Sequence, residues 1–261
     1  MAGGRFTRFS RRWLLITAAT AIAVAGAIAV VIALVSGDGD GSGSLAVNAG
    51  NDSREPVVKG PATQFVIQLG DKPDGYRAFP PQTFILTPVA WAASGLFESQ
   101  ADGEAKAEAW GFKDGYQATL EPLGQLADVA QGKYYLRVES VLFENASGAH
   151  NAYGQIVETL KRVPGSEKQE VNGLGNESSG WKLLGEPVAT TELPGAFHRF
   201  IFRRGNLLTT VQTYGVDQFM TIARAREFAD VIDQKALGQR PAPTPTPGSS
   251  GTLPPAPTPT R

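Results

Sequence analysis

The chain has 261 residues, with 24 Lys and Arg against 25 Asp and Glu, and it contains no cysteine. This composition excludes disulfides, thiolate catalysis, lipid attachment through cysteine and zinc sites built on cysteine. The near-neutral total hides an uneven distribution, because residues 60–238 hold 16 basic and 21 acidic side chains, a net charge of −5. That excess of acid argues against nucleic acid or an anionic membrane surface as the partner of this segment.

The N-terminal region combines a short basic segment with a long apolar run. Residues 1–12 hold four arginines and no acid, and residues 13–35 are uncharged. A helix from Leu14 to Val35 would cover roughly 33 Å, enough for the hydrocarbon core of a bilayer. We therefore expect one transmembrane helix at 13–35, with a cytoplasmic N-terminus and the remaining chain outside the cell membrane, as the positive-inside rule directs.

A cleaved export signal is the alternative interpretation of the same run. Residues 10–15, SRRWLL, resemble a twin-arginine signal, and Ala27 and Ala29 offer small residues for cleavage. The apolar run is longer than the about 7 to 15 residues of such signals, which favours an anchor over a secreted protein.

Two segments of biased composition frame the central part. Residues 36–59 are rich in Gly, Ser and Asp and are expected to form a flexible linker. Residues 239–261 form a Pro- and Thr-rich tail, which we expect to be disordered. The segment at 60–238 is long enough for one domain with its own core.

The central segment alternates between β-rich runs and helical patterns. In chain order, the sequence predicts strands at 63–69, 82–87, 116–120 and 133–143, a helix at 99–110, and a helix that Ser147 caps and Pro164-Gly165 ends. Residues 197–214 predict a hairpin with a two-residue turn at Gly205-Asn206, followed by a helix at 217–237. This pattern indicates an α+β domain, an antiparallel sheet packed by helices.

In the expected register of this hairpin, alternate residues share a face. The face that we expect to be the core holds His198, Phe200, Phe202, Arg204, Leu207, Thr209, Val211 and Thr213. The opposite face is mixed, and the odd positions of the strand at 133–143 extend it if both lie in one sheet.

We predict a ligand-binding surface on this mixed face. Its candidate residues are Tyr135, Arg137, Glu139, Arg199, Arg203, Gln212 and Tyr214. Charged and aromatic groups on a rigid platform suit an anionic or glycan-like ligand. The alternative is that helices cover this face, and that the arginines extend past apolar neighbours or pair with acids.

Several short motifs follow one another in a recognisable order. They are LGDKPDGY at 69–76, a long strand ending at Phe143 before a Gly-Ala helix start, GLGNES at 173–178 and FRRGN at 202–206. Together they resemble exported, membrane-anchored proteins of actinobacteria and related phyla. The soluble part of those proteins is similar to the extracellular sensor-type domain of mycobacterial receptor kinases and to the Mog1/PsbP-like lipoproteins. The resemblance implies a Mog1/PsbP-like sandwich and a binding or sensing domain without established catalysis.

The residues themselves indicate no catalytic chemistry. His150 and His198 lack the local spacing of zinc motifs, and neither a phosphate-loop lysine nor a Gly-x-Ser-x-Gly elbow occurs. We therefore expect no cofactor, no metal and no enzymatic activity. The predicted function is a binding, sensor or adaptor domain whose partner is an envelope protein or an anionic or glycan ligand; the alternatives are an exported hydrolase-type enzyme or a structural spacer of the cell envelope.

Overall fold

The computed structural model describes residues 57–68, 70–71, 75–124, 135–187, 194–217 and 220–240. The predicted anchor at 13–35, most of the predicted linker and almost all of the predicted tail lie outside these described residues. Within the described ranges, no helix has both the length and the apolar character that are needed to cross a membrane.

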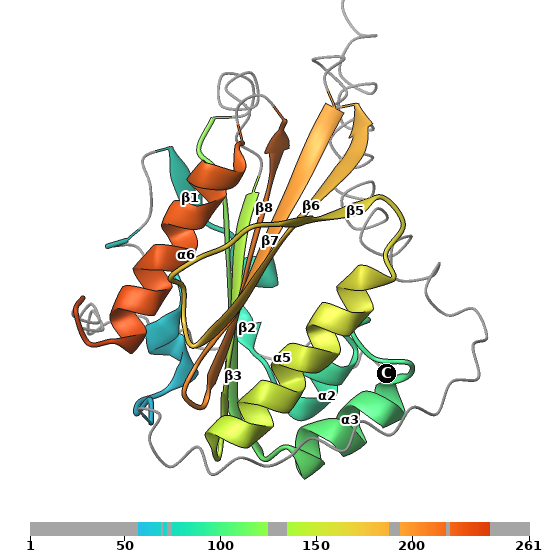
Figure 1. The fold of residues 1–261 in the computed structure, drawn as a ribbon. Helices are drawn as coiled ribbons and strands as arrows, with labels where there is room; N and C mark the ends of the chain where they lie inside the picture. Colours follow the sequence, from blue (N-terminus) through green and yellow to red (C-terminus); the bar gives the residue numbers. More distant parts are fainter. Residues whose placement is uncertain are drawn as a thin grey trace, which may run out of the picture.

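An eight-stranded antiparallel sheet forms the centre of the fold (Figure 1). Its strands are β1 (Tyr76–Ala78), β2 (Phe84–Ile85), β3 (Phe112–Pro122), β4 (Tyr135–Phe143), β5 (Ser166–Gln169), β6 (Glu177–Pro187), β7 (Pro194–Arg204) and β8 (Leu207–Val216). Their order in the sheet is β1-β3-β4-β8-β7-β6-β5, and β2 also pairs with β3.

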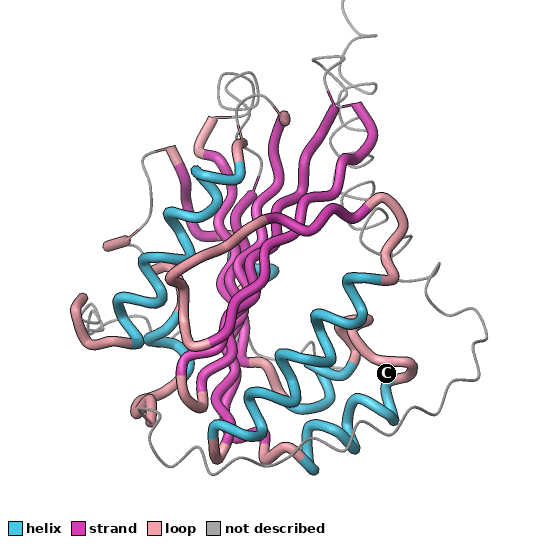
Figure 2. Tube along the Cα trace, in the orientation of Figure 1, coloured by secondary structure: helices cyan, strands magenta, loops and turns pink. Residues whose placement is uncertain are grey.

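Helices lie on both sides of this sheet (Figure 2). They are the short 3-10 helices η1 (Ala62–Phe65) and η2 (Pro80–Gln82) and the α-helices α2 (Pro88–Ala92), α3 (Gln100–Ala109), α5 (Ala146–Lys161) and α6 (Ile222–Ala236). On one face, Leu136 and Val138 of β4 belong to a core that includes residues of η1 and α6. On the other face, Val141 and Phe143 of the same strand belong to a core with α2 and α5. The expected α+β architecture, an antiparallel sheet packed by helices, is confirmed.

The β7–β8 hairpin has the register that the sequence predicts. Arg204 pairs with Leu207 across a two-residue turn, and Phe200 lies opposite Val211. Gly205 has a φ of 57°, in the left-handed region that glycine adopts at low cost and that tight hairpin turns require.

The predicted strand at 63–69 is wrong. Residues Ala62–Phe65 form the 3-10 helix η1 instead. The reason lies in tertiary hydrogen bonds: the Ala62 N–H donates to Asp114 Oδ2 at 2.6 Å, and the Phe65 carbonyl accepts from Ser140 Oγ at 2.6 Å. The segment therefore packs across the sheet instead of pairing along one of its edges.

Two helices begin at other residues than predicted. α5 is capped by Asn145, whose side chain accepts from the Gly148 N–H at 2.9 Å, and not by Ser147. α6 is capped by Thr221 and begins at Ile222, five residues after the predicted start at 217. β8 extends to Val216, and the Asp217 N–H still donates to the Pro194 carbonyl at 3.0 Å, so the chain leaves the sheet later than the sequence predicts.

Several parts of the chain meet at the β7–β8 turn. Asn206 Nδ2 donates to the Phe143 carbonyl at 3.0 Å, and Asn206 Oδ1 accepts from the Val58 N–H at 2.7 Å. The Gly205 N–H donates to Asn176 Oδ1 at 2.7 Å. The turn thus connects the end of β4, the first described residues of the chain and the segment that precedes β6.

Arg204 extends these contacts to α6. Its Nε and Nη2 donate to the two carboxylate oxygens of Asp233 at 2.8 and 2.7 Å, and Asp233 Oδ2 also accepts from the Gly175 N–H at 3.2 Å. Gly175 has a φ of 63°, and a Cβ there would lie 2.4 Å from the Arg203 carbonyl oxygen. The motif at 175–177 therefore has a structural role. We call residues 203–206 and these partners the turn cluster.

We predict that Asn206→Ala lowers the free energy of unfolding by about 2 to 4 kcal/mol, because it leaves the Val58 N–H and the Phe143 carbonyl without partners. Equilibrium urea unfolding followed by tryptophan fluorescence measures this loss. Asn172→Ala is the matched control, because the Asn172 side chain bonds Glu170 at an exposed site, and its effect should stay within about 0.5 kcal/mol. Equal losses in both variants would contradict the role of the turn cluster.

Candidate functional site

One face of the sheet changes character along its strands. Beneath α5 it is largely apolar apart from Arg203 and Glu177, but farther from the β7–β8 turn Arg199 lies opposite Gln212, and Gln212 lies opposite Arg137. The adjacent rows on the same face carry Glu139 on one side and aromatic residues on the other. We call this region the polar face, and it consists of Tyr135, Arg137, Glu139, Phe197, Arg199, Gln212 and Tyr214.

Gln212 organises the polar face through its side-chain amide. Its Oε1 accepts from Arg199 Nη2 at 2.6 Å and, more weakly, from Arg137 Nη2 at 3.5 Å. Its Nε2 donates to the hydroxyl of Tyr135 at 2.6 Å. Because Gln212 is buried, these bonds hold the two guanidinium groups side by side against one amide oxygen.

Negative charge on the polar face does not balance the two arginines. Glu139 Oε1 lies 3.7 Å from Arg137 Nε, which is beyond hydrogen-bond distance. Arg137 Nε is buried and has no hydrogen-bond partner among the described residues. The side chains of Arg137 and Glu139 are only 15% and 17% exposed. One carboxylate thus faces two guanidinium groups, and a donor remains unused.

Burial and neighbouring charge shift the pKa values on the polar face. Burial lowers the pKa of Arg199, Glu139 opposes this effect, and the positive charge of Arg137 adds to it. Burial also raises the pKa of Tyr135 above 10.0, although both arginines oppose that shift. The pKa of Arg137, by contrast, is raised, because Glu139 and Tyr135 more than offset its burial. Since arginine remains charged in proteins, the uncompensated cost of burial falls on Arg199, and a bound anion would reduce it.

An aromatic shelf borders the two arginines. The rings of Phe197 and Tyr214 stack with centroids 4.2 Å apart, and the ring of Tyr135 lies 6.0 Å from that of Tyr214. Arg137 Cζ lies 5.9 Å from the centroid of the Tyr135 ring, within the range of a cation–π contact.

Arg203 is the predicted site residue that the structure separates from the others. It is on the same side of the sheet but two rows closer to the turn, and it is 4% exposed. Its Nε donates to Glu177 Oε2 at 2.6 Å, and Glu177 Oε1 lies 2.8 Å from His150 Nδ1 of α5. Burial alone would raise the pKa of Glu177, but hydrogen bonds from His150 and Arg203 lower it overall. Arg203 therefore forms an ion pair beneath α5 and does not belong to an open binding surface.

The second histidine lies on the opposite face of the sheet. His198 is 1% exposed, and its Nδ1 has no partner among the described residues. Burial, assisted by the positive charge of Lys182 and opposed by Asp217, lowers the pKa of His198 to about 4. Within the described ranges, no group of three or more potential ligands is arranged to hold a metal ion.

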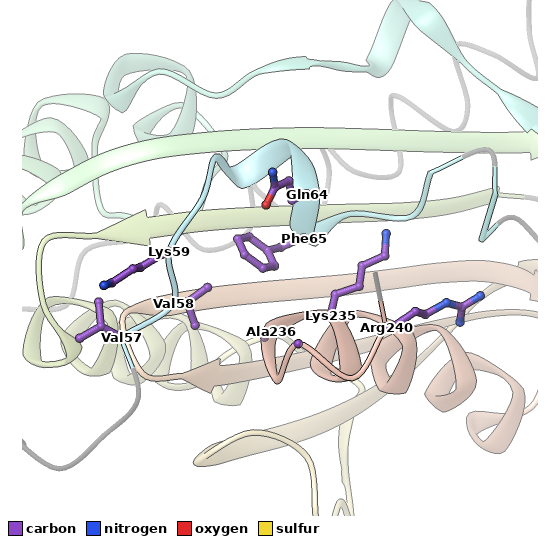
Figure 3. A pocket seen from close by; sticks show the side chains of 9 residues that line it. Val57, Val58, Lys59, Gln64, Phe65, Lys235, Ala236 and Arg240 are labelled. Carbon is purple, nitrogen blue, oxygen red and sulfur yellow. The ribbon is translucent and has the colours of Figure 1, made fainter. Parts of the chain in front are cut away.

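Two cavities lie outside the polar face, and the sequence reasoning missed both. One of about 280 Å³ lies beside the end of α6 and includes Lys235 and Arg240 in its lining (Figure 3). The other, of about 360 Å³, is bordered by α2, α3 and Phe112. One signal was available for the first: Lys235 stands three residues after Ile232 on the inward stripe of the helix, where a lysine is unusual.

Comparisons with known proteins give little. No family model and no curated protein matches the chain. Among solved structures, the extracellular domain of PknH from Mycobacterium tuberculosis is similar, with a TM-score of 0.43 and 12% sequence identity over 68% of this chain and 95% of that one. This neighbour is of the kind that the motifs resemble, but at this distance it assigns neither a family nor a site.

We predict that Arg203→Met lowers the free energy of unfolding by about 3 kcal/mol, because it leaves the Glu177 carboxylate without its buried partner. Urea unfolding of Arg203→Met, Glu177→Gln and the double variant measures the coupling between the two side chains. The double variant should lose clearly less than the two single losses combined. Additive losses would show that the ion pair does not hold these strands.

The lowered pKa of His198 predicts a pH-dependent stability. An unfolded histidine titrates near 6.5, so the unfolded state binds more protons than the folded state as the pH falls from about 6.5 to about 4. The free energy of unfolding should therefore fall by about 2 kcal/mol between pH 7.5 and pH 5 on account of this group. His198→Gln should remove that part of the slope in urea unfolding at both pH values, and an unchanged slope would contradict the assignment.

Proposed function

We propose that this chain is a non-catalytic extracytoplasmic binding or sensor domain, held at the cell membrane by residues 13–35, and that its polar face binds an anionic group. The observation that carries the proposal is the convergence of Arg137 and Arg199 on Gln212 Oε1, with Glu139 as the one acid of the polar face. A second copy of the chain or an envelope protein that presents such a group would use the same contacts.

The type of side chain supports an oxyanion as the bound group. Arginine presents a planar fork of donors that matches carboxylate and phosphate oxygens, and hydrogen bonds between charged partners are the strong ones. Hydrogen bonds to Gln212 Oε1 hold the Nη2 groups of both arginines in place. Fixed donors lower the entropy that binding would otherwise cost.

The aromatic shelf supports a ring-shaped body attached to that anion. Stacked Phe197 and Tyr214 present flat apolar surface next to the arginines. Such surfaces pack against planar rings and against the apolar faces of sugars. An acidic sugar unit combines both features, which agrees with the anionic or glycan-like ligand that the sequence predicts.

The polar face favours binding over catalysis. Tyr135, whose pKa is raised, keeps its proton at neutral pH and is already the acceptor of a hydrogen bond from Gln212. Glu139 lies against Arg137. Neither side chain is arranged beside a nucleophile in the way that general base catalysis needs.

We predict that Arg137→Ala combined with Arg199→Ala weakens binding of an oxyanion by at least about tenfold, the effect of losing charge-assisted hydrogen bonds. Isothermal titration calorimetry with inorganic phosphate, citrate and oligogalacturonate measures it. The control is Arg77→Ala combined with Arg226→Ala, which removes the same charge from ion pairs elsewhere on the surface. Equal affinity in both double variants, or no binding of any probe to the unaltered chain, would contradict the proposal.

A further inference from the structure

The cavity beside the end of α6 is lined by cations and by no acid. Lys59, Lys235 and Arg240 contribute to its wall, together with the amide of Gln64 and the ring of Phe65. Figure 3 shows that these side chains come from the segment before η1, from η1 and from the end of α6, with Lys59 on one side and Lys235 and Arg240 on the other.

The donors of this cavity are only partly used. Lys235 Nζ donates to the Val66 carbonyl at 2.8 Å and also pairs with Asp71, and Arg240 Nε lies 3.2 Å from the same carboxylate. The Asp71 carboxylate is thus shared between Lys235 and Arg240. Lys59 has no ion-pair partner among the described residues. The cavity and its wall therefore carry excess positive charge.

One apolar side chain of the lining is exposed, and a second exposed one belongs to a residue that is adjacent to lining residues in the chain. Val57, which lines it, is 64% exposed, and Leu237, which lies between the lining residues Ala236 and Gly238, is 42% exposed. Cations beside exposed apolar groups match a membrane surface, where phosphates attract the cations and the apolar groups enter the boundary between headgroups and acyl chains.

The position of the cavity agrees with this chemistry. Val57, Val58 and Lys59 line the cavity, so the chain that leads from the predicted anchor joins the domain beside it. The turn cluster binds Val58 at this end of the sheet. The polar face lies toward the opposite end, since Tyr214 follows Leu207 along β8 by about 24 Å at about 3.4 Å per residue.

We propose that this cavity docks on the outer surface of the membrane and takes the phosphate of an anionic lipid headgroup, so that the polar face points away from the membrane. The inference rests on the proposed function, because it needs the anchor at 13–35. The net charge of −5 over residues 60–238 makes the attraction local and sensitive to salt, because it comes from Lys59, Lys235 and Arg240, whose combined charge the shared Asp71 carboxylate offsets only in part.

The absence of cysteine makes a direct test possible. The full chain with Leu237→Cys, or with Leu184→Cys as the matched site at the other end of the sheet, carries a single fluorophore. Each protein is reconstituted into vesicles of phosphatidylcholine and phosphatidylglycerol that contain an acceptor lipid. We expect several-fold more energy transfer from position 237 than from position 184, and less transfer from 237 at high salt.

Charge reversal in the cavity tests whether its cations cause the energy transfer from position 237. Lys59→Glu combined with Arg240→Glu should reduce the transfer from position 237 to the level of position 184. Arg77→Glu combined with Lys161→Glu, which changes exposed residues elsewhere by the same charge, should leave it unchanged. Equal transfer from both positions, or full transfer in the cavity variant, would overturn the docking.

Carbonate extraction of the same vesicles separates this inference from the proposed function. Release of the chain by carbonate would contradict the anchor and the docking together. Resistance to carbonate with equal transfer from both positions would contradict the docking alone. If glycerol phosphate protects the chain against urea through Lys59 and Arg240 while position 237 shows no transfer, the cavity takes soluble phosphate, and lipid docking is wrong.

Discussion

The β7–β8 turn is the constraint on which the rest of the structure depends. Through Asn206 it binds the end of β4 and the first described segment, and through Arg204 it binds α6. Arg203, the residue before Arg204, binds Glu177, and Glu177 in turn contacts His150 of α5. These bonds satisfy backbone and charged groups that would otherwise be buried without partners, so one end of the sheet is fixed by polar contacts as well as by its two cores.

The extent of α5 decides where the polar face begins. Along β7 the same face carries Arg203 and Ile201 in the region that the helix covers and then Arg199 beyond it. The two arginines are four residues apart and have the same direction from the strand, yet one is a structural ion pair and the other lies half-buried beside Arg137. Coverage by a helix, and not residue type, separates their roles.

The sequence predicted the structure correctly where a single local pattern determined it. Alternation of side chains and the Gly205-Asn206 turn predicted the hairpin register and placed Arg199, Gln212 and Tyr214 on one face. It was insufficient for β6, whose residues Glu177–Pro187 include two glycines and several polar side chains and become a strand by pairing with β7. It was also insufficient for Arg203 and for the cavity, because both depend on contacts between distant segments, such as Lys235 with Val66 across 169 positions.

The bond from the Val58 N–H to Asn206 Oδ1 has a mechanical consequence. A force applied at residue 57 would reach, through this bond, the tip of a hairpin that lies inside the sheet, where β7 and β8 are both paired with neighbours on each side. Such a force would load two interior strands and the ladders on both sides of each, whereas a force on an edge strand would meet a single ladder. The start of the domain is thus joined to the interior strands of the sheet and not to one of its edges.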